Sequence, residues 1–298
     1  MRIVITGAGG FLGRALVRQL KGVHDIVAVD RTLGGEEGVE GDIADPAILR
    51  TVFHGGCDAV VHLATVAGGA AEQAPETAFA SNVDASVQLA SAAAAAGSKP
   101  RFIFASSVAI YGDTLPQVVD DATLPAPHML YGAHKAMTET WLDTQTRRGA
   151  ISALSLRLPG LVARPPGPSG MKSAFMSELF HALANGSPIL LPVSADATMW
   201  LMSVERAAAN FRHAIEIEAT GAMTLPALRA RMADLVRAVA TETGQPANLA
   251  LYEPDAAIER AFGALPSLET PRAEREGFAA DEDLQALAAS AFETLKRK

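Results

Sequence analysis

The sequence has few of the residues that would tie it to a disulfide, a metal or a membrane. Cys57 is the single cysteine among 298 residues, which excludes an intramolecular disulfide and a cysteine-rich metal site. The seven histidines show none of the spacings typical of zinc sites, so we predict no metal. No run of 18 apolar residues occurs, and the apolar start 1–5 is too short for a signal peptide. We therefore expect a cytoplasmic protein.

Basic residues and aromatic residues are also scarce. The 25 Lys and Arg are outnumbered by 33 Asp and Glu, and this net charge of −8 argues against nucleic acid as a partner. Aromatic residues make up 5% of the chain, yet hydrophobic residues as a whole reach 49%. Such a chain can bury a large core, which excludes intrinsic disorder, and its length fits one large domain or two unequal ones.

Short apolar segments alternate with helical ones over the first 160 residues. The expected strands are 2–6, 25–29, 57–63, 101–106 and 151–158, and the expected helices are 11–21, 46–54, 75–96 and 131–148. This alternation predicts βαβ units and an α/β fold with a doubly wound parallel sheet, the Rossmann architecture.

The pattern changes at Pro159, where a segment rich in proline and glycine predicts a loop. Beyond it we expect helices at 172–185, 203–218, 228–243, 254–262 and 281–296, and short strands at 189–192 and 222–225. We predict a nucleotide-binding domain at 1–165, with 189–225 returning to its sheet. A smaller, mostly helical substrate-binding part would consist of 166–188 and 226–298.

A glycine-rich segment joins the first strand to the first helix. Residues 6–13, TGAGGFLG, fit the pattern T-G-x-x-G-x-x-G. Gly7 permits the tight turn, Gly10 lets backbone N–H groups approach a pyrophosphate, and Gly13 lets the helix pack on the strand. Because three spaced glycines also occur in ordinary βα turns, the motif needs further support.

That support comes from a carboxylate at the end of the second strand. Asp30 lies 17 positions after Gly13, where a carboxylate can accept both ribose hydroxyls and repels a 2′-phosphate. We therefore predict NAD as cofactor; a capping role for Asp30, or binding of NADP through Arg31, are the alternatives. Asp42 and Ile43 could meet the adenine ring, although an ordinary polar turn explains Asp42 equally well.

Three further residues point to alcohol chemistry. Tyr131 and Lys135 stand four apart and share a helix face. An ammonium beside a phenol lowers the pKa of the phenol, and a phenolate can take the proton of an alcohol as hydride leaves the adjacent carbon. Ser107 follows the strand 101–106, at the edge where open α/β sheets bind ligands. A Tyr–Lys pair alone is a common surface arrangement. The prediction therefore rests on the order along the sequence of the glycine loop, Asp30, Ser107 and the Tyr131–Lys135 pair.

These segments resemble the extended short-chain dehydrogenase/reductase family, also called the NAD-dependent epimerase/dehydratase family. The resemblance rests on TGAGGFLG at 6–13, HLAT at 62–65, SNVDAS at 81–86, FASSVAIYG at 104–112, YGAHKAM at 131–137 and LRLPGLVARP at 156–165. It implies a catalytic Ser107, with Tyr131 as general base and Lys135 as its partner. It also implies a homodimer paired through the helices 75–96 and 131–148.

The motif and the resemblance together define a predicted NAD site. Its residues are Gly7, Gly10, Phe11, Leu12, Gly13, Asp30, Asp42, Ile43, Leu63, Ala64, Thr65, Asn82, Tyr131, Lys135 and Pro159. Within this set, Asn82 matches a helix position that supports the active site, and Pro159 matches the start of a loop over the nicotinamide.

The substrate class follows from weaker features. The region 160–200 offers a diphosphate only Arg164 and Lys172 as cations, and LRLPG lacks an Asn that many nucleotide-sugar epimerases have. The segments 164–170, 199–210 and 254–266 resemble the D-erythronate dehydrogenase branch. That resemblance implies NAD-linked oxidation of a small sugar acid at C2 to the 2-keto acid.

In that interpretation Arg164, Lys172 and Ser173 bind the substrate carboxylate, while Ser107 binds the alcohol oxygen. The alternative for the first three is a solvated loop. For the whole chain, the alternatives are an NAD-dependent nucleotide-sugar epimerase or dehydratase, and a non-catalytic NAD-binding protein.

Overall fold

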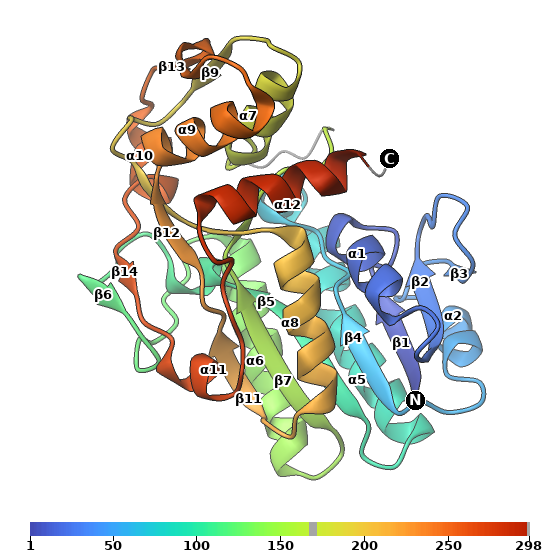
Figure 1. The fold of residues 1–298 in the computed structure, drawn as a ribbon. Helices are drawn as coiled ribbons and strands as arrows, with labels where there is room; N and C mark the ends of the chain where they lie inside the picture. The colour runs from blue at the N-terminus through green and yellow to red at the C-terminus, as the bar shows by residue number, and fades with distance from the viewer. Residues whose placement is uncertain (167–171, 297–298) are drawn as a thin grey trace. The chain divides into compact units, whose positions relative to one another are not determined.

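The computed structural model of the protein describes residues 1–166 and 172–296 (Figure 1). The chain divides into two compact units. The first unit consists of Met1–Gly112, Pro125–Leu158 and Ala208–Thr224, and the second of Asp113–Leu124, Pro159–Ala207 and Leu225–Lys298. Part of the proline- and glycine-rich segment, residues 167–171, lies outside the described residues, as does the corresponding portion of the predicted substrate-binding part.

Within the described residues, one sheet of seven parallel strands forms the centre of the first unit. Its order is β11-β7-β5-β4-β1-β2-β3. The strands are β1 (Arg2–Thr6), β2 (Asp25–Asp30), β3 (Val39–Glu40), β4 (Ala59–His62), β5 (Arg101–Ser107), β7 (Ser152–Leu158) and β11 (Gly221–Thr224). The strand order reverses between β1 and β4, and open sheets bind ligands beyond the carboxyl ends at such a reversal. The predicted doubly wound α/β fold is confirmed.

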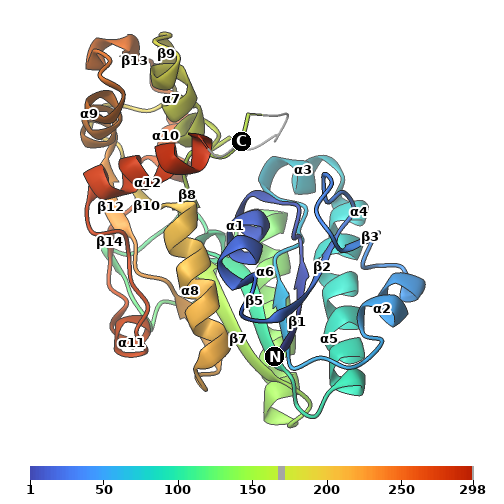
Figure 2. The same cartoon turned by 45° about the vertical axis from the view of Figure 1, so that its right-hand side comes forward.

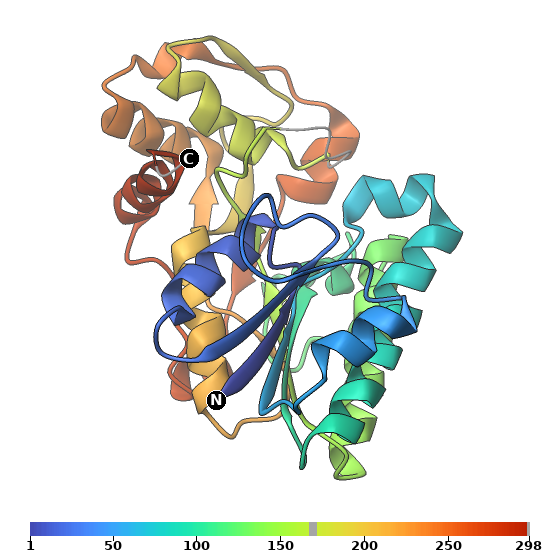
Figure 3. The same ribbon diagram turned by 90° about the vertical axis from the view of Figure 1, so that its right-hand side faces the viewer.

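Helices cover both faces of this sheet, which is why its central strands are mostly apolar. Helix α1 (Phe11–Leu20) and residues 208–216 of α8 (Val204–Glu216) lie on one face (Figures 2 and 3). The other face carries α2 (Pro46–Val52), α5 (Ala85–Ala96) and α6 (Leu130–Arg147). Helix α2 shows how the sequence sets a helix start, because the Asp45 carboxylate accepts the N–H of Ala47 at 2.8 Å and Pro46 occupies the first turn.

The predicted helix 75–96 is interrupted in the structure. After α3 (Gly68–Gln73), the chain forms α4 (Pro75–Phe79), then a π-helical turn at Ala80–Asp84, and then α5. The carbonyl of Asn82 in this turn accepts the hydroxyls of Ser86 at 2.8 Å and Thr138 at 3.3 Å. Side chains thus satisfy a backbone group in the irregular turn, a kind of turn that often occurs at functional sites.

The second unit has its own hydrophobic core. Helices α7 (Phe175–Ala184), α9 (Met232–Thr243) and α12 (Leu284–Lys296) contribute to it, and the rings of Phe180 and Phe292 lie 5.6 Å apart. A small sheet has the order β12-β10-β8, from β8 (Gly160–Leu161), β10 (Thr198–Met202) and β12 (Leu228–Arg231). The remaining elements are β6 (Val118–Val119), β9 (Ile189–Leu191), β13 (Ala250–Tyr252), α10 (Ala256–Phe262), β14 (Ser267–Leu268) and α11 (Pro271–Arg275).

Two expectations for this region need correction. The predicted helix 228–243 begins only at Met232, because 228–231 form strand β12, in which apolar and exposed arginine side chains alternate with the period of a strand. The expectation that 189–225 return to the large sheet applies to β11, which pairs with β7. Strands β9 and β10 instead pair within the second unit.

No helix among the described residues is both long enough and apolar enough to span a membrane.

Candidate active site

The glycine loop is packed against its surroundings so closely that side chains would not fit. Gly7 has a φ of +72°, a conformation that favours glycine, and an ideal Cβ there would lie 2.6 Å from the backbone N of Ala64. A Cβ on Gly13 would lie 2.1 Å from the carbonyl oxygen of Gly7. The structure therefore brings the predicted loop, at the end of β1, against Ala64, at the end of β4.

The start of helix α1 is suited to an anion. Gly10 is the N-cap, and a glycine has no side chain that could cap the helix. An ideal Cβ on Gly10 meets only the Gly7 carbonyl oxygen within 4 Å, at 3.1 Å. The N–H groups of Phe11 and Leu12 belong to the first turn, whose donors have no partner within the helix. The positive end of the helix dipole adds to this attraction for a phosphate.

Asp30 stands beside this loop. Its carboxylate accepts the N–H of Gly9 at 3.0 Å and that of Thr32 at 3.4 Å. A carboxylate has about four lone-pair positions, so it can hold the loop and still accept ribose hydroxyls. Asp42 accepts the N–H of Ala44 at 2.9 Å, as an ordinary polar turn residue does. Ile43 is buried in the hydrophobic core of the first unit.

Asn82 fixes the backbone that follows β4. Its side-chain oxygen accepts the N–H of Val66 at 2.7 Å and the hydroxyl of Thr65 at 3.0 Å, and its amide donates to the Val66 carbonyl at 2.8 Å. At the strand end itself, the N–H of Leu63 donates to the Thr6 carbonyl at 3.1 Å. The predicted residues Leu63, Ala64, Thr65 and Asn82 therefore lie together at the reversal of the strand order.

Two serines end β5, and their surroundings differ. Ser106 is 1% exposed and donates its hydroxyl to Glu139. Ser107 is partly exposed and caps a short 3-10 turn at Val108–Tyr111, its oxygen accepting the N–H of Ala109 at 3.2 Å. The geometry favours Ser107 as the serine that meets a ligand.

Tyr131 and Lys135 lie on the first turns of α6. The Lys135 ammonium is 5.5 Å from the centre of the Tyr131 ring and 4.5 Å from that of Phe104. Lys135 is 2% exposed, and burial lowers its pKa to about 7, while the charge of Glu139 acts in the opposite direction. An ammonium so placed can stabilise a phenolate at Tyr131.

His62 is a buried structural histidine next to this pair. Its two ring nitrogens contact the hydroxyls of Thr6 at 2.6 Å and Ser86 at 2.7 Å, and its ring stacks on Phe104 at 5.6 Å. Burial, with a smaller effect of Lys135, lowers its pKa to about 3. The imidazole is therefore neutral near pH 7.

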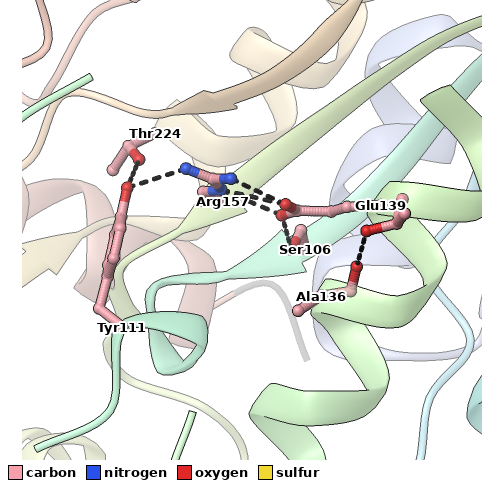
Figure 4. A network of polar contacts seen from close by, with 7 residues as sticks. Ser106, Tyr111, Ala136, Glu139, Arg157 and Thr224 are labelled. Atoms are coloured by element: carbon pink, nitrogen blue, oxygen red, sulfur yellow. Dashed lines mark hydrogen bonds and ion pairs between the residues drawn. The ribbon is translucent and has the colours of Figure 1, made fainter. Parts of the chain in front are cut away.

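A buried polar network that the sequence pattern does not reveal adjoins these residues (Figure 4). Arg157 on β7 donates to the two oxygens of Glu139 at 3.1 and 2.8 Å, and on its other side to the Tyr111 hydroxyl at 3.0 Å. The Tyr111 hydroxyl lies 2.6 Å from that of Thr224, and Ser106 donates to Glu139. An arginine inside the apolar strand 151–158 is the sequence signal that could have indicated this network.

Pro159, Arg164, Lys172 and Ser173, the remaining predicted residues, belong to the second unit. Pro159 joins β7 to β8, and the carbonyl of Arg164 contacts Nε2 of His181 at 2.6 Å. Lys172 lines a pocket of about 250 Å³ that also includes the carboxylates Glu178 and Glu253.

Comparison with known proteins places this site in a family. A model of the NAD dependent epimerase/dehydratase family matches residues 3–222. D-erythronate dehydrogenase of Cupriavidus necator is 33% identical, with 94% of each chain covered, and that of Haemophilus influenzae is 32% identical, with 73% of each covered. The solved structure of a nucleoside-diphosphate-sugar epimerase from Agrobacterium tumefaciens is 27% identical, covers 98% of this chain and 94% of that chain, and has a TM-score of 0.88.

The predicted family resemblance and the predicted cofactor are thereby confirmed. The chain belongs to the NAD-dependent epimerase/dehydratase family, and it is an NAD-dependent enzyme of the extended short-chain dehydrogenase/reductase type.

Proposed function

We propose that the protein is a dehydrogenase that oxidises the C2 alcohol of a small sugar acid, such as D-erythronate, to the 2-keto acid. The observation that carries the proposal is the buried Lys135 ammonium, 5.5 Å from the Tyr131 ring, in a unit with a complete dinucleotide loop. The substrate class rests on the similarity to two proteins named D-erythronate dehydrogenase, one of which matches 94% of this chain.

The residues of the first unit fit NAD. The start of α1, where Gly10 has no side chain to cap the helix, suits the pyrophosphate, and the Asp30 carboxylate beside Gly9 suits the hydroxyls of the adenosine ribose. Lys135 is proposed to hold the nicotinamide ribose. The remaining proposed contacts are Gly7, Phe11, Leu12, Gly13, Asp42, Ile43, Leu63, Ala64, Thr65, Asn82, Tyr131 and Pro159.

Bound NAD⁺ supplies the acceptor for the hydride that leaves C2. The chain handles the proton: the Tyr131 phenolate takes it from the alcohol oxygen, so that the C–O bond becomes a carbonyl. Ser107 donates a hydrogen bond to the same oxygen and fixes its position. Lys135 stabilises the phenolate before the transfer. Oxidation releases a proton, and only the phenolate form of Tyr131 can accept it. The rate should therefore rise with pH as Tyr131 ionises.

The substrate carboxylate is assigned to the segment around Arg164. A guanidinium can bind a carboxylate through two parallel hydrogen bonds, and His181 holds the backbone of this residue in place. Lys172 and Ser173 remain candidates, but Glu178 and Glu253 in the Lys172 pocket would repel an anion, so Arg164 is the stronger one.

An epimerase is the second candidate function, favoured by the similarity to the Agrobacterium protein. An epimerase returns the hydride to its substrate and leaves no net NADH. The decisive experiment is an assay of NADH formation with NAD⁺ and a panel containing four-carbon sugar acids, the uncharged polyol of the same length, and UDP-sugars. We expect turnover of an acid only. Comparable oxidation of the polyol would overturn the substrate class, and interconversion of UDP-sugars without NADH would favour the epimerase.

Variants assign the roles. Tyr131→Phe keeps the ring but removes the base, so kcat should fall about 100-fold or more with NAD affinity little changed. Arg164→Gln should raise KM for the acid more than it alters NAD binding. Unchanged turnover by Tyr131→Phe would remove Tyr131 from the mechanism.

We further propose a homodimer that pairs α5 and α6 of two subunits. Two large apolar side chains on α6, Met137 and Trp141, are 47% and 39% exposed. Burying them between subunits would remove apolar surface from water. Light scattering at micromolar concentration should give twice the chain mass of 31.0 kDa, and a monomer mass would contradict the pairing.

A further inference from the structure

The buried network of Figure 4 adjoins two parts of the active site at once. Ser106 is the chain neighbour of Ser107 at the end of β5, and Glu139 follows Lys135 by one helical turn on α6. A single carboxylate therefore contacts the strand end that carries the serine and belongs to a residue one helical turn beyond the lysine. Neither Glu139 nor Arg157 is needed for the chemistry proposed above.

We propose that Glu139 is a positioning residue, whose fixed negative charge keeps Lys135 in its ammonium form and so favours the phenolate of Tyr131. This inference rests on the proposed roles of Tyr131 and Lys135.

The position of the Glu139 charge is fixed from two sides. Arg157 binds both carboxylate oxygens, and Ser106 donates a hydroxyl to one of them. Arg157 is itself held by the Tyr111 hydroxyl and lies 5.4 Å from the centre of the Tyr111 ring. Bidentate geometry of this kind restricts a carboxylate more than a single hydrogen bond does. The carboxylate is therefore held in one position by β5 and β7, and it belongs to the residue one helical turn beyond Lys135.

The other groups around Lys135 do not supply a compensating negative charge. From β4, His62 is neutral near pH 7, and from β5 the neighbouring side chain is the Phe104 ring. On β7, Arg157 is a cation paired with Glu139, so it supplies no negative charge to Lys135. From α3, Glu72 accepts the N–H of Leu130 and acts on His134, the neighbour of Lys135. Within the described residues, Glu139 is the carboxylate that raises the pKa of Lys135 against the effect of burial.

The proposed function requires the Tyr131 phenol to ionise beside the Lys135 ammonium, and two groups that interact in this way titrate as a coupled pair. When the pair has lost one of its two titratable protons, it exists either as a phenolate with an ammonium or as a phenol with a neutral amine. A negative charge one turn beyond Lys135 favours the first arrangement, which is the form that can take a proton from an alcohol. Without that charge, Lys135 loses its proton at lower pH, and Tyr131 then ionises with no ammonium beside it.

Direct titration of Tyr131 tests this without reference to substrate. The chain has three tyrosines, so the ultraviolet difference spectrum of tyrosinate contains three contributions. Subtracting the titration curve of Tyr131→Phe isolates the ionisation of Tyr131, which is called the Tyr131 step below. Glu139→Gln keeps the shape and polar atoms of the side chain but removes the charge, and should move this step upward by about one pH unit or more. The pH dependence of kcat should move in the same direction.

Two further variants separate this role from a merely structural one. Glu139→Gln leaves Arg157 buried without its partner. The double variant Glu139→Gln with Arg157→Met removes both charges and should recover stability, and because a positive charge is lost as well, its Tyr131 step should lie between those of the wild type and Glu139→Gln. In a Lys135→Met background, Glu139→Gln should have no additional effect on the step, because the charge acts through Lys135.

The outcomes distinguish this inference from the proposed function. A Tyr131 step that is low in the wild type and unmoved in both Glu139 variants overturns the role of Glu139 alone. A shift of equal size in the Lys135→Met background overturns the route through Lys135. A wild-type Tyr131 step that Lys135→Met leaves unmoved overturns the pairing of Tyr131 with Lys135, and this inference with it.

Discussion

Asp30 offers a sharp test of how the protein selects its cofactor. Its carboxylate accepts the N–H of Gly9 at 3.0 Å, so it contributes to the shape of the glycine loop as well as to the charge beside it. Substitution by alanine removes both contributions. Substitution by asparagine keeps an oxygen that can accept the Gly9 N–H and removes only the charge.

The expected sizes follow from ordinary interaction energies. A hydrogen bond to a charged group contributes about 1.5–3 kcal/mol, and each 1.4 kcal/mol is about tenfold in Kd, so Asp30→Ala should weaken NAD about 10- to 150-fold. A carboxylate and a 2′-phosphate about 4 Å apart repel by about 1–4 kcal/mol, depending on solvent exposure. Removing that repulsion offsets the lost hydrogen bond in the binding of NADP but not of NAD, so the preference for NAD should narrow about fivefold or more.

Calorimetric titration of NAD and NADP into the wild type and both variants measures these effects. We expect Asp30→Asn to lose most of the discrimination while its loop remains ordered, and Asp30→Ala to lose discrimination and additional affinity for both dinucleotides. If the wild type binds NADP as tightly as NAD, Arg31 dominates the choice. If Asp30→Ala binds NAD within about threefold of the wild type, the carboxylate does not hold the ribose and the assignment is wrong.

Two further predictions concern the packing of the first unit. In Gly13→Ala the new Cβ would lie 2.1 Å from the Gly7 carbonyl oxygen, so we expect a loss of about 1–3 kcal/mol in stability and a weakened NAD site. Gly149→Ala, with φ of +76° and open space around it, is the matched control that should lower the Tm but leave NAD affinity unchanged. For His62, the pKa is about 3 in the folded protein and 6.5 in the unfolded chain, so the unfolded state takes up a proton as pH falls between these values. The protein therefore loses stability through this window, and His62→Gln should flatten the dependence of Tm on pH; an unchanged slope would assign the loss to other groups.

Local chemical requirements explain which parts of the fold are predictable. The first strand and the glycine loop are readable because a buried parallel strand needs apolar residues and Gly7 needs a left-handed conformation. The π-helical turn at Ala80–Asp84 is not readable, because its backbone is stabilised by side chains such as Thr138, which is distant in sequence. Strand β12 escapes prediction because its four residues adjoin a strong helical pattern, and its pairing partner, β10, is equally hard to recognise from the sequence.

The same distinction, between residues predictable from local sequence and residues revealed only by tertiary contacts, applies to the candidate site. Tyr131 and Lys135 can be found because their spacing on one helix is itself the signal, and Ser107 because strand ends bind ligands. Glu139 also lies on that helix, yet nothing in its spacing shows that its charge is held by Arg157 from β7. That contact exists only after α6 has packed on the sheet. Burial then makes an unpaired carboxylate costly, and pairing with Glu139 makes an arginine tolerable in an apolar strand. The residues that perform the proposed chemistry are thus visible in the sequence, whereas the residue proposed to set their charge becomes visible only in the folded chain.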